Sequence, residues 1–183
     1  MKAKTIISWA SLLIIIDQAI KIVINTFFLE TRFEIIPSLF EFKPVFNIHH
    51  SYFNSLLYNK YQINIGLLPH IILFLFAGVI MFMLYNILKK NISNNAKLLD
   101  IAIIFALAGF FCGLSGNLIW KKGTLDYIYL KPLFVFDLKD IYINCFAVLF
   151  LVYFLKNKPQ IDAIKTKDTI SYVKNMFNKS TIK

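Results

Sequence analysis

The sequence is poor in charged residues, in glycine and proline, and in cysteine. Only 16% of its 183 residues are charged, against roughly 25% in soluble globular domains. Its two cysteines, Cys112 and Cys145, lie within apolar runs, where a free thiol packs as a small hydrophobic group. They therefore indicate neither a disulfide framework nor a cysteine metal motif. These shortages exclude an ordinary soluble domain and a small disulfide-stabilised fold.

Apolar residues make up 58% of the chain and give a mean hydropathy of +0.63. They gather in four runs, three of which are long enough to cross about 30 Å of hydrocarbon as helices. The fourth apolar run begins at residue 141 and is too short to cross that distance, so its helix is expected to start a turn earlier. The sequence predicts an all-α membrane protein, a four-transmembrane-helix bundle in domain 1–155, followed by a basic tail over 156–183. The expected helices are 6–24, 67–88, 98–119 and 138–155.

The positions of lysine and arginine predict the orientation, because positive flanks are retained in the cytoplasm. With both termini inside, the cytoplasmic pieces hold twelve of the 20 basic residues and the outer loops hold seven. We therefore expect cytoplasmic termini, with residues 26–66 and 120–139 outside. In the first outer loop, apolar and polar residues alternate over 39–43, which predicts a small extracytoplasmic β element between the first and second helices.

The net charge of +10 does not indicate nucleic-acid binding, because the basic residues flank membrane segments instead of forming one folded face. The tail could contact anionic lipid headgroups or remain solvated, and its pattern fits both. Residues 1–16 are similar to a cleavable signal peptide. However, the apolar run continues past Asp17 without a small-residue cleavage site, so we expect a retained first helix.

Acidic residues near the outer side of the membrane are the candidates for chemistry. Asp17 lies inside the first span, four residues before Lys21 and on the same helical face. This pair could be structural or functional. Asp126, Asp137 and Asp140 lie at or near the same outer interface. Two close carboxylates can share one proton and act as base and acid together, although loop acids can also simply offset neighbouring lysines.

Four segments of the sequence, in order, resemble the lipoprotein signal peptidase family, also called signal peptidase II. Residues 17–21 (DQAIK) resemble the family's D-Q-x-x-K motif, and Phe46-Asn47 stands where the family has N-x-G-x-A-F. Residues 113–119 (GLSGNLI) are similar to G-A-x-G-N-L-I. Residues 124–128 (TLDYI) and 136–140 (FDLKD) stand where the family has V-V-D-F-I and F-N-x-A-D. The order and the four-helix frame make the resemblance specific.

The resemblance implies an aspartic endopeptidase of the bacterial cytoplasmic (inner) membrane. Such an enzyme cleaves the signal peptide of diacylglyceryl-modified prolipoproteins just before the lipidated cysteine. By the resemblance, Asp126 and Asp140 form the catalytic dyad. It implies no cofactor and no metal, and we expect a single chain in contact with membrane lipid to be active. Residues expected to bind substrate or support the site are Asp17, Asn47, Asn117, Lys121 and Asp137.

The sequence departs from the family pattern around the proposed dyad. Trp120 and Lys121 stand where the family has aspartate and arginine, Asp137 where it has asparagine, and Lys139 where it has alanine. A third carboxylate at Asp137 would raise the cost of ionising its neighbours, and Lys139 or Lys121 could offset it. Trp120 is expected either to anchor its helix at the interface or to cap the site against lipid.

The sequence supports three other functions less well than the peptidase. A non-catalytic protein of the same fold that binds lipidated polypeptides is the alternative that the altered dyad surroundings support. A small transporter is disfavoured, because the helices lack paired broken segments at mid-membrane. A zinc site from His49, His50 and His70 is disfavoured too, because adjacent residues in an extended segment point to opposite faces.

Overall fold

The computed structural model describes residues 1–48, 52–120 and 123–164. Within these ranges it describes only the backbone of residues 52, 53, 55, 56, 117 and 119. Four of its helices are long and apolar enough to cross a membrane, which confirms the predicted four-helix bundle. The ends of the predicted helices differ from the observed ones by at most a few residues. The helices are α1 Ala3–Val23, continued by a π-helical turn Ile24–Phe28, α2 Tyr52–Tyr61, α3 Leu67–Asn91, α4 Ala96–Ile119, α5 Leu138–Lys156 and α6 Lys158–Asp162.

Helix α4 is the centre of the bundle. It packs along both α1 and α5, and its span is much more buried than the other three. Ile103, Ile104 and Ala106 of α4 meet Ile6 and Ala10 of α1 in an apolar cluster. The outward faces of α1, α3 and α5 carry exposed large apolar side chains. In water this exposure would be unfavourable, whereas a lipid bilayer solvates it.

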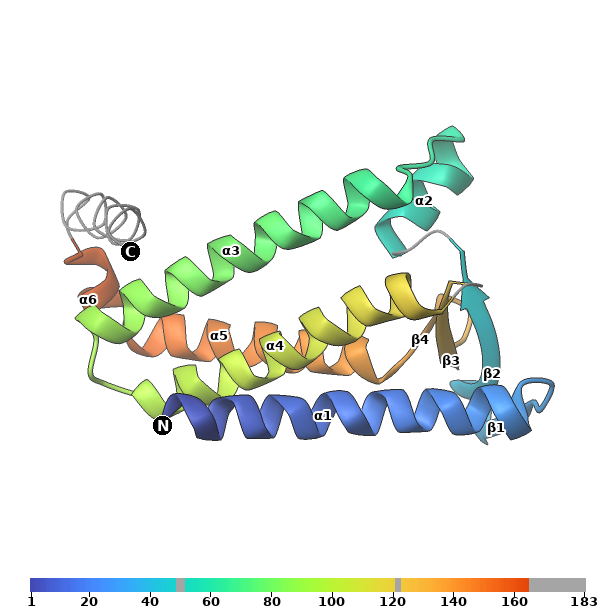
Figure 1. Ribbon diagram of the computed structural model, residues 1–183, viewed down its shortest axis with the longest axis horizontal. Coiled ribbons are helices and arrows are strands. Elements are labelled where there is room, and N and C mark those ends of the chain that lie inside the picture. Colours follow the sequence, from blue (N-terminus) through green and yellow to red (C-terminus); the bar gives the residue numbers. More distant parts are fainter. Residues whose placement is uncertain (49–51, 121–122, 165–183) are drawn as a thin grey trace, which may run out of the picture.

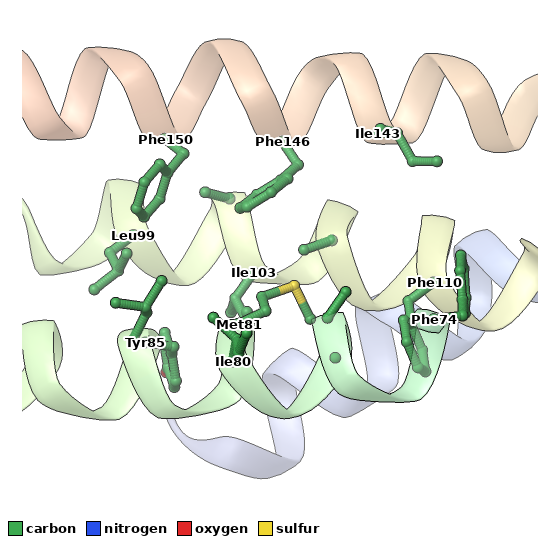
Figure 2. A pocket seen from close by; sticks show the side chains of 15 residues that line it. Phe74, Ile80, Met81, Tyr85, Leu99, Ile103, Phe110, Ile143, Phe146 and Phe150 are labelled. Carbon is green, nitrogen blue, oxygen red and sulfur yellow. The ribbon is translucent and has the colours of Figure 1, made fainter. Parts of the chain in front are cut away.

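Helix α3 diverges from the rest of the bundle toward one end (Figure 1). An apolar cavity of about 390 Å³ lies between α3, α4 and α5, and Figure 2 shows Phe74, Met81, Phe110, Phe146 and Phe150 among its lining. At the other end, the buried carboxylate of Asp100 in α4 ties the two helices together. It accepts a hydrogen bond from Tyr85 Oη at 2.8 Å and pairs with Lys89 Nζ at 2.5 Å.

A four-stranded antiparallel sheet closes the end of the bundle opposite Met1 and α6 (Figure 1). The predicted β element is present, but it is only half of this sheet, because the segment between α4 and α5, where no strand is predicted, adds two more. Pro44, which has no N–H to donate, lies where the register between β2 and β3 shifts. The strands, in their order across the sheet, are β1 Phe33–Ile36, β2 Phe40–Asn47, β3 Thr124–Leu130 and β4 Phe134–Phe136.

The pairing of β2 with β3 brings two loops together that are far apart in sequence. Asn47 lies opposite Thr124, and Val45 lies opposite Asp126. Strand β4 then leads directly into Asp137 and the start of α5. The sheet therefore places the acidic residues of the second loop at the mouth of the helix bundle.

Candidate active site

Asp126 of β3 and Asp140 of α5 lie close together where the sheet meets the bundle. One carboxylate oxygen from each, together with one from Asp137, falls within a group whose members are all within 4.8 Å of one another. The side chain of Asp126 is 5% exposed, that of Asp137 is fully buried, and that of Asp140 is 35% exposed. Asp140 is therefore the member of this acid cluster that water reaches most easily.

The start of α5 orients Asp140. Asp137 is the N-cap residue, and its carboxylate accepts the backbone N–H of Asp140 at 3.3 Å. In return, Asp140 Oδ2 accepts the backbone N–H of Asp137 at 3.2 Å. This reciprocal capping box uses two backbone donors that a helix start would otherwise leave unpaired. Asp137 therefore precedes the helix and caps it.

The ammonium group of Lys139 lies among the three carboxylates. Its Nζ is 3.0 Å from Asp126 Oδ1, 2.9 Å from Asp137 Oδ1 and 3.3 Å from Asp140 Oδ2. Its side chain is 11% exposed. Because a lysine ammonium has three hydrogens, these three contacts can engage all of them. The sequence indicated that Lys139 could offset the extra carboxylate, and the structure confirms that contact.

A second lysine lies deeper, on α1. Lys21 Nζ is 2.9 Å from Asp17 Oδ2 and 2.6 Å from Asp137 Oδ2, and all three side chains are fully buried. The predicted Asp17–Lys21 pair is thus present and extends to Asp137. Through Lys21, the first helix is joined to the beginning of α5. Among the described side chains, Lys21 connects Asp17 to Asp137.

Asn47 and Trp120 border the site on other sides. Asn47 Nδ2 donates to Asp126 Oδ2 at 3.4 Å. The Trp120 indole donates to Gln18 Oε1 at 3.2 Å, and Gln18 Nε2 donates to Asp17 Oδ2 at 2.8 Å. Trp120 therefore connects the end of α4 to the buried acid on α1. Its predicted roles as an interface anchor or as a cap against lipid both stay predictions.

Some predicted site residues fall outside what the structure describes. Asn117 is in the last turn of α4, but its side chain is not described, and Lys121, His49 and His50 lie outside the described residues altogether. His70 is in α3, near Phe74. Among the described residues, Asp126, Asp137 and Asp140 are the group close enough to hold a metal ion. The ammonium of Lys139 already places positive charge between them.

Burial and charge act differently on the two acids that precede α5. Burial raises the pKa of Asp126 above its usual value, and neighbouring Lys139 only partly offsets this effect. Burial acts in the same direction on Asp137, but Lys139 and Lys21 outweigh it and hold the pKa of Asp137 below its usual value. Asp137 is therefore the acid that stays ionised, and Asp126 is the one that retains a proton more readily.

The fold and the site define a multi-pass membrane protein that gathers acidic groups where its helices meet a small sheet. The sequence matches the signal peptidase (SPase) II family over residues 9–156, and the chain belongs to that family. Members are proteases that process lipoprotein signal peptides. The recognition made from the sequence motifs is thereby confirmed.

Solved structures show the same fold. Two bacterial membrane enzymes determined by the in meso method, at 1.9 and 2.3 Å resolution, superpose with TM-scores of 0.59 and 0.57. They share 20% and 19% sequence identity with this chain, and the alignments cover 85% of it and 95% and 90% of the respective relatives. Comparison with curated protein sequences gives no significant match. At such low identity the structural likeness supports the fold alone.

Proposed function

We propose that the chain is an intramembrane aspartic endopeptidase that removes the signal peptide from diacylglyceryl-modified prolipoproteins, cutting just before the lipidated cysteine. The observation that carries this proposal is the meeting of Asp126 and Asp140, which come from a strand and a helix and bring carboxylate oxygens within 4.8 Å of each other. Two carboxylates at that separation can hold one water molecule between them and the scissile bond.

The chemistry needs a base that takes a proton from water and a second group that draws electrons from the scissile carbonyl. Asp126 and Asp140 can fill both roles when they share one proton. Such a proton belongs to the coupled pair, so the two pKa values describe the pair as a whole. The burial of Asp126 favours the protonated form that a dyad requires.

The supporting residues act through the dyad. Asn47 donates to Asp126, and Asp137 caps the helix that presents Asp140. Asp17 braces Asp137 through Lys21. Asn117 and Lys121 remain proposed substrate-binding or supporting residues on the strength of the family motif.

The membrane would deliver the substrate to this site. We place both termini and the tail from residue 156 in the cytoplasm of a bacterial inner membrane, and the site at the outer face. Each acyl methylene buried in the bilayer contributes roughly 0.8 kcal/mol to attachment, so a diacylglyceryl group would hold a substrate at this depth. Because Asp126 and Asp140 meet within a single chain, we propose that the monomer is active.

A second function is favoured by one specific observation. Lys139 lies within 3.3 Å of both Asp126 and Asp140, where a dyad would hold water. If this ammonium permanently neutralised both acids, the protein would bind lipidated polypeptides without cutting them.

A cleavage assay separates the two functions. Purified protein is incubated with a diacylglyceryl-modified prolipoprotein and with the same precursor lacking the lipid, and products are resolved by gel and mass spectrometry. The peptidase predicts a product beginning at the lipidated cysteine, with little cleavage of the unmodified precursor. Retention of the lipidated precursor without any product would contradict the peptidase and support the binder.

A further inference from the structure

Lys139 lies at the centre of the acid cluster. Its ammonium contacts Asp126, Asp137 and Asp140, and the contact with Asp140 is the longest of the three at 3.3 Å. Asp140 is also the most exposed of these acids, whereas Asp126 and Asp137 are almost fully buried. The ammonium is therefore held firmly on its buried side and more loosely on the side that faces water.

The charges around Lys139 explain why it stays there. Four carboxylates, from Asp17, Asp126, Asp137 and Asp140, are connected through two ammonium groups, those of Lys21 and Lys139. Each ammonium bridges carboxylates from different elements. With more acids than lysines, the cluster keeps negative charge to spare even when both lysines are protonated, which favours the charged form of Lys139.

An ammonium between two carboxylates allows both of them to ionise, because its charge offsets their repulsion. In a dyad without such a group, like charges at short range force one acid to keep a proton, and that proton polarises the carbonyl. Lys139 relieves this repulsion directly. It also brings a fixed positive charge to the point where a carbonyl oxygen would become negative, and stabilising that charge is commonly the largest part of catalysis.

We propose that Lys139 is a catalytic residue whose ammonium polarises the scissile carbonyl and stabilises the oxyanion, while Asp140 acts as the base and Asp126 and Asp137 hold the ammonium in place. This assignment rests on the proposed peptidase function and gives the carbonyl-polarising role to the ammonium of Lys139, in place of a proton shared by Asp126 and Asp140. It follows from the geometry, since the one loosely held hydrogen of Lys139 is the one beside the exposed acid.

The reaction then proceeds in two steps. Asp140, as a carboxylate, takes a proton from water, and the water oxygen bonds to the carbonyl carbon. The π electron pair of the carbonyl moves to its oxygen, which accepts the hydrogen bond that Lys139 has withdrawn from Asp140. When that pair returns, the C–N bond breaks and the proton on Asp140 passes to the leaving nitrogen. The products are a carboxylic acid and an amine, and Asp140 is again a carboxylate.

The test compares Lys139→Met with wild type in a steady-state cleavage assay across a pH range. Loss of an oxyanion-stabilising donor should lower kcat by about 100-fold or more while KM changes little. The remaining activity must rely on a protonated carboxylic acid, so its alkaline limb should move at least about 1 pH unit lower. Lys139→Arg keeps the charge and should retain more activity than Lys139→Met. Lys131→Met is the matched control, because Lys131 pairs with Glu34 and Glu41 at the far edge of the sheet.

Removing Lys139 alone leaves Asp126 and Asp140 without their cation and Asp137 with Lys21 only, and the variant could fail to fold. The double variant Lys139→Met with Asp137→Asn removes one charge of each sign and keeps a good N-cap residue on α5. It should elute as folded protein in detergent and show the same loss of kcat and the same shift of the alkaline limb.

Three results would overturn the inference. Activity of Lys139→Met or of the double variant within about 3-fold of wild type, or an unmoved alkaline limb, would make Lys139 structural. Higher activity in either variant than in wild type would make it an inhibitory group. If the wild type cleaves but Asp126→Asn and Asp140→Asn also cleave normally, the dyad itself is wrong and the role of Lys139 falls with it.

Discussion

At the scale of single residues, the buried Lys21 is the link between the first helix and the site. Its ammonium has no exposed area and joins Asp17 to Asp137. Taking such ions out of water is costly, and the pairing compensates only while every partner is present. The pair therefore holds a residue of the acid cluster in place, and its functional role stays a prediction.

Replacing Lys21 tests this link. Lys21→Met should destabilise the protein by about 3–5 kcal/mol, because it leaves the buried carboxylate of Asp17 without its cation and leaves Asp137 with Lys139 alone. Thermal unfolding in detergent micelles measures the loss. Lys131→Met, which removes a half-buried lysine paired with Glu34 and Glu41 near the surface, should leave the unfolding temperature nearly unchanged. Equal effects of the two substitutions would contradict the account.

Asp137 predicts a pH dependence of stability. Although burial opposes ionisation, Lys139 and Lys21 hold the pKa of Asp137 below its usual value in the folded protein. Its stabilising contribution is therefore complete above the unfolded pKa of about 3.9 and is lost as the pH falls through the lower folded value. The unfolding temperature of wild type should fall on acidification below about pH 4, and that of Asp137→Asn should fall less. Parallel curves for the two proteins would refute this role.

Residue spacing predicted only part of this network. The separation of four between Asp17 and Lys21 places them on one helical face, so their contact follows from the sequence. The contacts of Lys21 with Asp137 and of Lys139 with Asp126 join segments more than ten residues apart. They depend on how α1, β3 and α5 pack, which no local pattern contains.

At the scale of elements, Gly123, which directly precedes β3, has a backbone conformation that favours glycine. Gly123 has φ of +98°, a region that residues with a side chain rarely adopt. A Cβ there would lie 2.3 Å from the carbonyl oxygen of Asn47. The turn thus allows β3 to approach β2 beside the residue that donates to Asp126.

Gly123→Ala should therefore impair the site through the backbone. Strain of about 1–3 kcal/mol is expected from the positive φ, and the clash must displace Asn47. Stability and kcat should both fall in the cleavage and unfolding assays. Gly66→Ala is the control, because nothing lies within 4 Å of a Cβ at that position. An active, stable Gly123→Ala variant would show that this close approach is dispensable.

The elements themselves were predictable to different degrees. Long apolar runs predicted the four spanning helices, since length and hydropathy are nearly sufficient in a bilayer. Strand β3 is not predicted by strict alternation of apolar and polar residues, although Thr124–Leu130 is rich in the β-branched and aromatic residues that favour strands. Helix α2 is short and its apolar pattern is weak, so residue patterning does not predict it.

At the scale of the whole molecule, the sheet lies at one end and Met1 and α6 at the other (Figure 1). The acid cluster belongs to the sheet end, because Asp126 is in β3 and Asp137 directly precedes α5. The surplus of basic residues predicts that the Met1 end faces the cytoplasm. In a background without Cys112 and Cys145, an impermeant thiol reagent on intact cells should label Leu133→Cys at the exposed end of the sheet. It should not label Asn94→Cys in the turn between α3 and α4 until the cells are opened. The reverse pattern would invert the proposed orientation.

The site as a whole exists only in the folded molecule. It draws on the first helix, on the strands of two separate loops and on the start of the last spanning helix. The family motifs located most of these residues in the sequence, because they mark the family's functional positions. They could not show that Lys139 would lie between the two proposed catalytic acids, because the family pattern has a small residue there.

The central claim is that Asp126 and Asp140 act as one catalytic unit, and the most direct measurement is kcat for the purified wild type, Asp126→Asn, Asp140→Asn and the double variant on a diacylglyceryl-modified prolipoprotein. The account predicts that each single substitution lowers kcat by at least about 100-fold. Because the two groups act together, the double variant should be little worse than either single one. A folded Asp126→Asn or Asp140→Asn variant that cleaves within a few fold of wild type would contradict the claim.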